Sequence, residues 1–89
     1  MSATVIPQAT PNPNAMKFSL DRPVVSGPSQ TYTSKENAAA NPLAAKLFEI
    51  PGVKQVFFLG NFVTVTKDSD ALWPDIGPRV EVVLREHFE

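Results

Sequence analysis

The alternation of apolar and polar residues between positions 53 and 67 predicts a central β-hairpin. Two β-branched and aromatic runs flank Gly60-Asn61, a dipeptide typical of a two-residue hairpin turn. With that turn, Leu59 faces Phe62, and the residues further from the turn pair in the same register. One side of the hairpin is then wholly apolar and is assigned to the core: Val56, Phe58, Val63 and Val65. A longer loop would exchange the two sides, and this alternative stays open.

The other side of the hairpin is mixed, which predicts a partly wet sheet face. Among its polar residues it carries three large apolar ones, Phe57, Leu59 and Phe62. We name these three as candidates for contact with a partner; the alternative is that they belong to the core. A stacking platform for nucleic-acid bases is disfavoured because only Lys54 and Lys67 flank the aromatic group.

Two further strands and a rigid loop are expected before the hairpin. Residues 4–8 are β-prone but contain Pro7, which cannot donate to a sheet ladder, so this strand is expected to lie at an edge or to bulge at Pro7. Residues 15–20 alternate and predict a half-buried strand antiparallel to the first. The loop between them contains two prolines, which restrict the backbone and predict a stiff candidate contact segment. Its residues are Thr10, Pro11, Asn12, Pro13 and Asn14.

The middle of the chain predicts an irregular connection, a short strand and a helix. Residues 21–29 show little periodicity, and residues 30–33 form a possible third strand around Tyr32. Asn41 and Pro42 are a typical N-cap and first helical residue, so a helix is expected from there to about Ile50. The alanines at 38–40 are assigned to a separate turn or packed linker, because the residue before a proline disfavours helical geometry.

The C-terminal segment predicts a second amphipathic helix that continues to the end of the chain. Asp68-Ser69-Asp70 is rich in capping side chains and is expected to open it. Gly77-Pro78 predicts a broken start or a kink, and Glu81 with Arg85 has the spacing of an ion pair. The predicted fold is α+β, in the order β-β-(β)-α-β-β-α. It has an antiparallel sheet of four to five strands and two helices on one face.

Composition narrows the class of protein. The 89 residues are expected to form one domain, 1–89, with 43% hydrophobic and 19% charged residues, which is typical of a globular protein. A net charge of -1, with scattered lysines and arginines, argues against nucleic-acid binding. No apolar run is long enough to span a membrane and no signal peptide is evident, so we predict a cytoplasmic protein without a membrane partner.

The chemistry available to the side chains argues against an enzyme. The chain has no cysteine, which excludes thiol catalysis and thiolate ligation of zinc or an iron-sulfur cluster. His87 is the single histidine and is interpreted as a last-turn residue favoured by the helix dipole rather than a metal ligand. Tyr32 has no ionisable partner nearby, and Asp68-Ser69-Asp70 lacks the rest of a calcium loop. We predict no catalytic residue, no metal and no cofactor.

Four blocks form a recognisable set when they are taken together. They are residues 10–18, residues 42–53, residues 56–58 with 62–67, and Trp73 with His87-Phe88. In this order and spacing they resemble the N-terminal domain of Nfu-type (NifU-like) iron-sulfur scaffold proteins. The resemblance covers nearly the whole chain and implies an α+β domain connected with iron-sulfur protein maturation.

In two-domain members of that family, a C-terminal domain holds the cluster on a Cys-x-x-Cys pair, for which this chain has no matching residues. The resemblance therefore implies a non-catalytic protein-interaction domain. Its partners would be proteins of iron-sulfur cluster biogenesis or an Nfu domain that bears Cys-x-x-Cys. The alternative hypothesis is a structural or regulatory module that binds a peptide or small ligand and is unrelated to iron-sulfur work.

Overall fold

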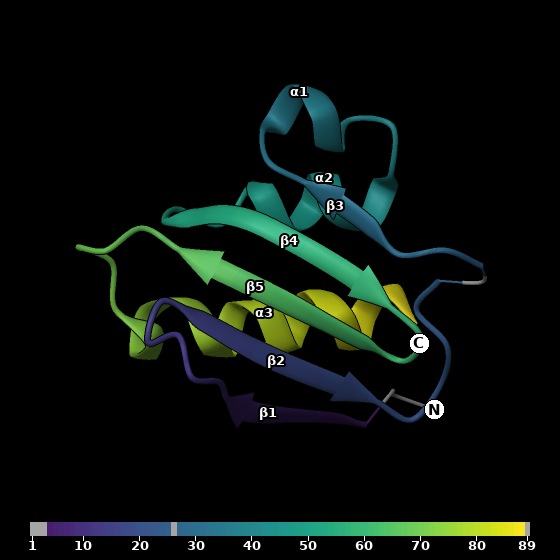
Figure 1. Cartoon of the computed structure of the whole chain (residues 1–89), viewed down its shortest axis with the longest axis horizontal. Helices are drawn as coiled ribbons and strands as arrows, with labels where there is room; N and C mark the ends of the chain where they lie inside the picture. The colour runs from purple at the N-terminus through teal and green to yellow at the C-terminus, as the bar shows by residue number, and fades with distance from the viewer. Residues whose placement is uncertain (1–3, 26, 89) are drawn as a thin grey trace.

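The computed structural model describes residues 4–25 and 27–88, and these form an antiparallel five-stranded sheet packed against helices (Figure 1). The strands are β1 (Val5–Ala9), β2 (Ala15–Leu20), β3 (Gln30–Tyr32), β4 (Val53–Leu59) and β5 (Phe62–Lys67). Their order across the sheet is β1-β2-β5-β4-β3. The predicted hairpin therefore lies near the centre of the sheet, and β1, which contains Pro7, lies at an edge as expected.

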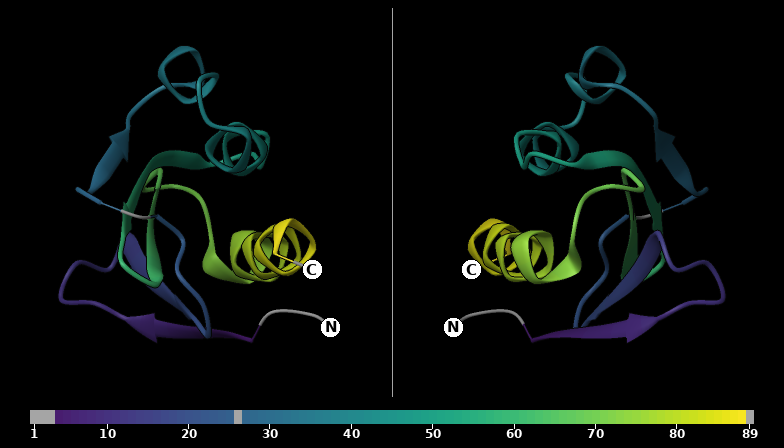
Figure 2. Two further views of the ribbon diagram at one scale, coloured as in Figure 1. Left: turned by 90° about the vertical axis from the view of Figure 1, so that its right-hand side faces the viewer. Right: turned by 90° about the vertical axis from the view of Figure 1, so that its left-hand side faces the viewer.

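Three helices accompany the sheet: α1 (Lys35–Ala38), α2 (Pro42–Phe48) and α3 (Trp73–His87). Figure 2 shows α2 and α3 on the same side of the sheet, with the opposite face uncovered. The predicted α+β class and the placement of the two long helices on one face are confirmed. The single-turn helix α1 is an addition, because Ala38 was assigned to a turn or linker; Ser34 caps it by accepting from the Asn37 amide at 3.0 Å.

The predicted hairpin register is confirmed. Leu59 pairs with Phe62, Phe58 with Val63, and Val56 with Val65, across the Gly60-Asn61 turn. The apolar side of the hairpin is fully buried under the helices, with Val56, Val63 and Val65 inaccessible to solvent. Its alternating pattern therefore determined which face became the core, because a slip of one residue would have exposed all four side chains.

The predicted start of α2 is also confirmed in detail. The Asn41 side chain accepts hydrogen bonds from the amides of Leu43 and Ala44 at 2.9 and 3.2 Å, and Pro42 is the first helical residue. The helix ends at Phe48, slightly earlier than expected, and the chain turns through Gly52 into β4. Gly52 has φ +96°, a conformation that L side chains rarely adopt.

The expected start of α3 was wrong, and so was the alternative of a broken first part of the helix. Its N-cap is Leu72, with no side-chain cap, so Asp68-Ser69-Asp70 does not open the helix. Asp68 instead begins a turn, because its carbonyl accepts from the Ala71 amide at 3.1 Å, while its own amide bonds the Gly52 carbonyl at 2.8 Å. The helix also runs unbroken through Gly77-Pro78. Pro78 lies on the exposed side of α3 and so does Pro74, whose carbonyl lacks its helical donor and can bond water instead.

Candidate functional site

The uncovered face of the sheet displays large apolar side chains in register. One row across the strands consists of Ile6, Ser19, Phe62 and Leu59, on β1, β2, β5 and β4 respectively. The next row runs through Lys17 and Phe57. Ile6 is 53% exposed and Leu59 40% exposed, although both are large hydrophobic residues. This face is therefore more apolar than a surface sheet requires.

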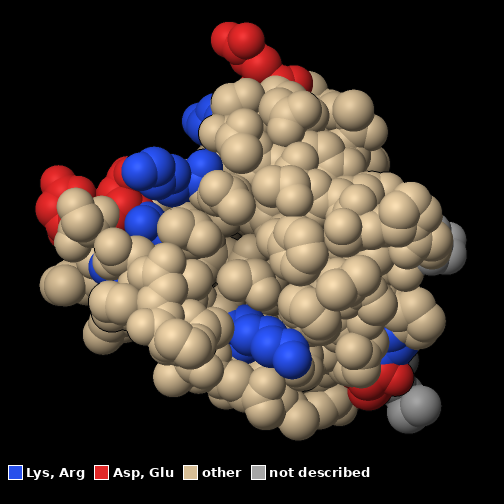
Figure 3. All heavy atoms as spheres, in the orientation of Figure 1, with Lys and Arg blue, Asp and Glu red and all other residues tan. Residues whose placement is uncertain are grey.

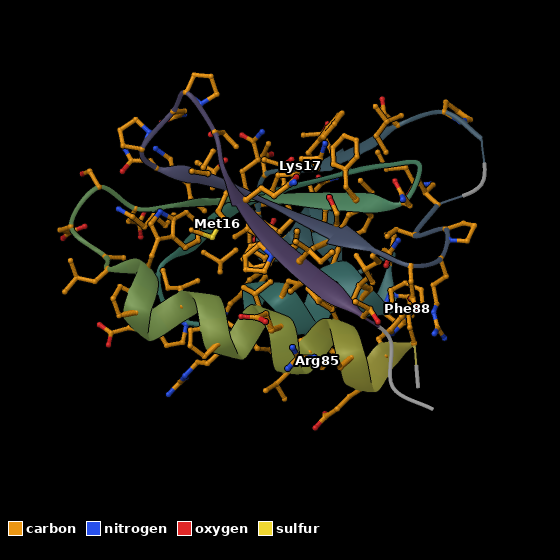
Figure 4. The ribbon with its side chains drawn as sticks, turned by 90° about the horizontal axis from the view of Figure 1, so that it is seen from below. Met16, Lys17, Arg85 and Phe88 are labelled. Atoms are coloured by element: carbon orange, nitrogen blue, oxygen red, sulfur yellow. The ribbon has the colours of Figure 1, made fainter. Side chains whose placement is uncertain are left out.

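We call five of these residues the open-face patch: Ile6, Lys17, Phe57, Leu59 and Phe62. The rings of Phe57 and Phe62 lie 6.2 Å apart in a tilted arrangement. The Lys17 ammonium lies 4.4 Å from the centre of the Phe62 ring, within the range of a cation-π interaction. Figure 4 shows Lys17 leaving β2 away from α3, whereas Met16 points toward the helix. Figure 3 shows that this face is mostly uncharged.

The loop of residues 10–14 is cross-linked by hydrogen bonds. The Thr10 hydroxyl lies 2.9 Å from the carbonyl oxygens of Asn12 and Ala15, and the Asn12 side chain accepts from the Asn14 amide at 2.9 Å. The Pro13 carbonyl accepts from the Trp73 indole at 3.0 Å, which ties the loop to α3. These bonds and the two prolines each restrict the backbone of the loop.

The structure does not bring the two predicted groups of contact residues together. The loop joins β1 to the start of β2, where Ala15 pairs with Thr66. Phe62 pairs with Ser19 near the other end of β2. Phe57, Leu59 and Phe62 do lie side by side, whereas Thr10 to Asn14 form a separate corner. The loop and the three apolar residues are therefore two separate candidate contact surfaces.

Lys67 is a buried cation, although the sequence pattern predicts only a charge that flanks the aromatic group. It is 8% exposed, and its ammonium donates to the Asn14 side chain at 3.0 Å and to the Asp68 carbonyl at 3.3 Å. The Trp73 ring lies 5.9 Å away. Since its partners come from the loop and from the connection to α3, Lys67 joins these segments at one corner of the sheet.

The titratable side chains were compared with the requirements of a metal site among residues 4–25 and 27–88. No cluster of three or more His, Asp or Glu side chains there is placed to hold a metal ion. Burial, and then the positive charge of Lys46, lower the pKa of His87 below its usual 6.5. This direction opposes the expected stabilisation of a charged His87 by the helix dipole. The Tyr32 hydroxyl donates to the Gln30 side chain at 2.8 Å.

The structure has a groove between α2 and α3 that the sequence pattern did not predict. Its volume is about 450 Å³, and its lining combines apolar with charged side chains: Ile50, Pro78, Val82, Val83, Lys46, Glu49 and Arg79. Val82 is 49% exposed. Val82 is apolar but falls outside the buried stripe of α3, and this feature of the sequence could have indicated the groove.

The five-stranded antiparallel sheet, with α2 and α3 on one face, defines a small α+β domain. The family model described as "Scaffold protein Nfu/NifU N terminal" matches residues 5–89. The chain belongs to this family, as the four sequence blocks indicated. None of the helices in the part of the chain that the structure describes is long and apolar enough to cross a membrane.

The chain matches part of a longer protein and the whole of a chain with a solved structure. The chain is 39% identical to the human "NFU1 iron-sulfur cluster scaffold homolog, mitochondrial" over 82 residues, which are 91% of this chain and 32% of that protein. It thus spans about a third of the length of this curated relative. The crystal structure of SAV1430 from Staphylococcus aureus matches with a TM-score of 0.80 and 32% identity, covering 100% of both chains.

A solution structure of a NifU-like protein from Saccharomyces cerevisiae has the same fold. It matches with a TM-score of 0.84 and 24% identity, over 98% of this chain and 79% of the other. The agreement in fold therefore extends to a sequence that has diverged considerably.

Proposed function

We propose that this domain is a non-catalytic interaction module of iron-sulfur cluster assembly that holds no cluster itself. Its family membership over residues 5–89 carries the link to this process. The donor set does not fit a cluster, because the chain has no cysteine and a single histidine. The proposed partners are proteins of iron-sulfur cluster biogenesis or an Nfu domain with a Cys-x-x-Cys pair. The cytoplasm is the proposed location; the human relative's name places that protein in mitochondria.

The proposed contact surface is the open-face patch, including the predicted residues Phe57, Leu59 and Phe62. Its support is the combination of exposed apolar side chains with an uncovered antiparallel sheet face. The loop of Thr10, Pro11, Asn12, Pro13 and Asn14 is a second proposed contact. Because it lies at the far end of β2, the two surfaces call for separate variants.

The decisive experiment measures binding to a purified Nfu domain that bears Cys-x-x-Cys, with and without its cluster, by calorimetry. Phe62→Ser is expected to weaken binding at least about tenfold because it removes a large apolar contact. Val82→Ser, which removes an exposed apolar side chain on α3, is the matched control and leaves binding unchanged. Asn12→Ala probes the loop in the same assay.

Two results would contradict the proposal. One is a stoichiometric cluster on this chain after anaerobic reconstitution with iron and sulfide, followed by its visible spectrum. The other is absence of binding to Cys-x-x-Cys domains and to purified cluster-assembly proteins. A loss of about 3–5 kcal/mol of folding stability in Phe62→Ser would instead identify Phe62 as a core residue.

A second candidate function is a structural or regulatory module that binds a peptide or small ligand. The groove between α2 and α3 favours it, because its volume of about 450 Å³ lies within the range of small-molecule sites. This function predicts that Val82→Ser disturbs binding of the natural ligand while Phe62→Ser does not. A pull-down that recovers cluster-assembly proteins favours the first proposal.

A further inference from the structure

The charge distribution on the open sheet face indicates what kind of segment would cover it. We propose that the open-face patch receives a partner segment in which a carboxylate lies between apolar side chains, with the carboxylate meeting the Lys17 ammonium. This inference rests on the proposed function, since it names the chemistry of the partner at the same surface.

Lys17 is the only charged residue among the register-paired residues of this face. Its neighbours across the strands are Gln8 on β1 and Thr64 on β5, which are both neutral. The other members of the face are apolar or carry hydroxyl or amide groups: Ile6, Ala15, Ser19, Thr31, Gln55, Phe57, Leu59, Phe62 and Thr66. Within the described residues, the recorded salt bridges pair Arg22 with Asp21 and Arg85 with Glu81, so Lys17 has no carboxylate partner.

A partner that covers Phe57, Leu59 and Phe62 also removes water from around Lys17. The ring of Phe62 compensates only part of that loss, because a cation-π contact is weaker than full hydration of an ammonium group. Burying a charge without an opposite charge is costly, so a stable complex needs an anion at this position. A carboxylate flanked by apolar side chains meets both requirements of the surface.

Two other occupants fit the same surface less well. A second copy of this chain, packed by twofold symmetry through the centre of the patch, would place the two Lys17 ammonium groups near each other. A single-stranded nucleic acid stacked on Phe57 and Phe62 would meet one cation, Lys17, among the register-paired residues of this face, on a chain whose net charge is -1. Such binders normally follow the phosphates with a positively charged groove.

The test is a selection of random twelve-residue peptides displayed on phage against the whole folded protein, repeated with Lys17→Glu. The wild type is expected to enrich peptides with Asp or Glu between apolar residues, whereas Lys17→Glu is expected to enrich Lys or Arg instead. Lys35→Glu is the matched charge reversal, because Lys35 is exposed on α1 and should leave the enriched class unchanged.

A double-mutant cycle then measures the pairing directly. One selected peptide and its Glu→Gln form are titrated against the wild type and Lys17→Met, a variant that keeps the apolar stem. Loss of the peptide carboxylate should weaken binding to the wild type about 30-fold or more, and binding to Lys17→Met much less. Circular dichroism verifies that each variant is folded.

Several outcomes would overturn the inference: selected peptides without a carboxylate, no selected peptide at all, or enrichment that Lys17→Glu does not change. Self-association of the wild type that is abolished by Phe62→Ser, or binding of oligothymidylate to the patch, would replace it with one of the other occupants. If peptide selection succeeds while cluster-assembly proteins fail to bind, the proposed function is wrong and the chemistry of the surface stands.

Discussion

The two faces of the sheet are built from alternate residues of the same strands, but one face is buried and the other is partly exposed to solvent. On the helix-covered face, Phe58 and Val63 form a cross-strand pair that is almost inaccessible to solvent. On the open face, one residue away, Phe57 pairs with Thr64 and both stay partly exposed. Phenylalanine occurs on both faces, so residue type alone does not decide which side chains of this domain are buried and which are exposed. Coverage by α2 and α3 decides it.

The largest expected effect comes from truncating neighbouring phenylalanines on the two faces. Phe58→Ala should lower the free energy of unfolding by about 3–5 kcal/mol, because it opens a cavity under the helices. Phe57→Ala should cost less than about 2 kcal/mol, since its ring is already partly in water. Urea denaturation of both variants measures the contrast. Equal losses would mean that Phe57 belongs to the core after all.

Gly52 and Gly60 allow a similar comparison between a crowded and an open position of the backbone. A Cβ on Gly52 would lie 2.9 Å from the Ala71 Cβ and 3.0 Å from the Ile76 Cδ1, where the sheet meets the helix layer. Gly52→Ala should cost about 3 kcal/mol from this crowding and the positive φ. Gly60 also has positive φ, +57°, but a Cβ there meets nothing within 4 Å. Gly60→Ala should therefore cost only about 1–2 kcal/mol, measured by thermal unfolding.

A substitution where the loop of residues 10–14 meets α3 should have an intermediate effect on folding stability. Trp73→Phe removes the indole donor to the Pro13 carbonyl and should lower stability by about 1 kcal/mol. The amides of Asn12 and Asn14 should then exchange faster with deuterium, while those of β4 remain protected. Unchanged exchange in the loop would mean that its own hydrogen bonds suffice to hold its shape.

The smallest predicted effect is the contribution of His87, on α3, to the pH dependence of folding stability. The pKa of His87 in the folded chain lies below 6.5 because of burial and Lys46, so the unfolded chain binds the proton more readily. Stability should therefore fall as the pH decreases through the unfolded value toward the folded one. His87→Gln should reduce this dependence between about pH 7 and about pH 5, as measured by urea midpoints. A steeper dependence in the variant would contradict the assigned direction.

Part of the candidate site followed from local pattern alone. The placement of Phe57, Leu59 and Phe62 on one face depends only on the Gly60-Asn61 turn and the period of two in a strand. Ile6 and Lys17 were not predictable as their neighbours, because that requires the pairing of β2 with β5 and of β1 with β2. Long-range strand order is not encoded in a short segment.

By itself, the sequence determined the Asn41 cap of α2 and the inability of the chain to ligate a cluster through thiolates, and it favoured the hairpin register that the structure has while leaving a longer loop open. These depend on neighbouring residues or on composition. Only the tertiary structure decided where α3 begins: the Asp68 amide still bonds the Gly52 carbonyl beside the sheet, and a turn closed by the Ala71 amide on the Asp68 carbonyl at 3.1 Å precedes the first helical residue, Trp73. It also decided that Lys17 stands alone among apolar and neutral residues, since contacts between distant strands place them side by side.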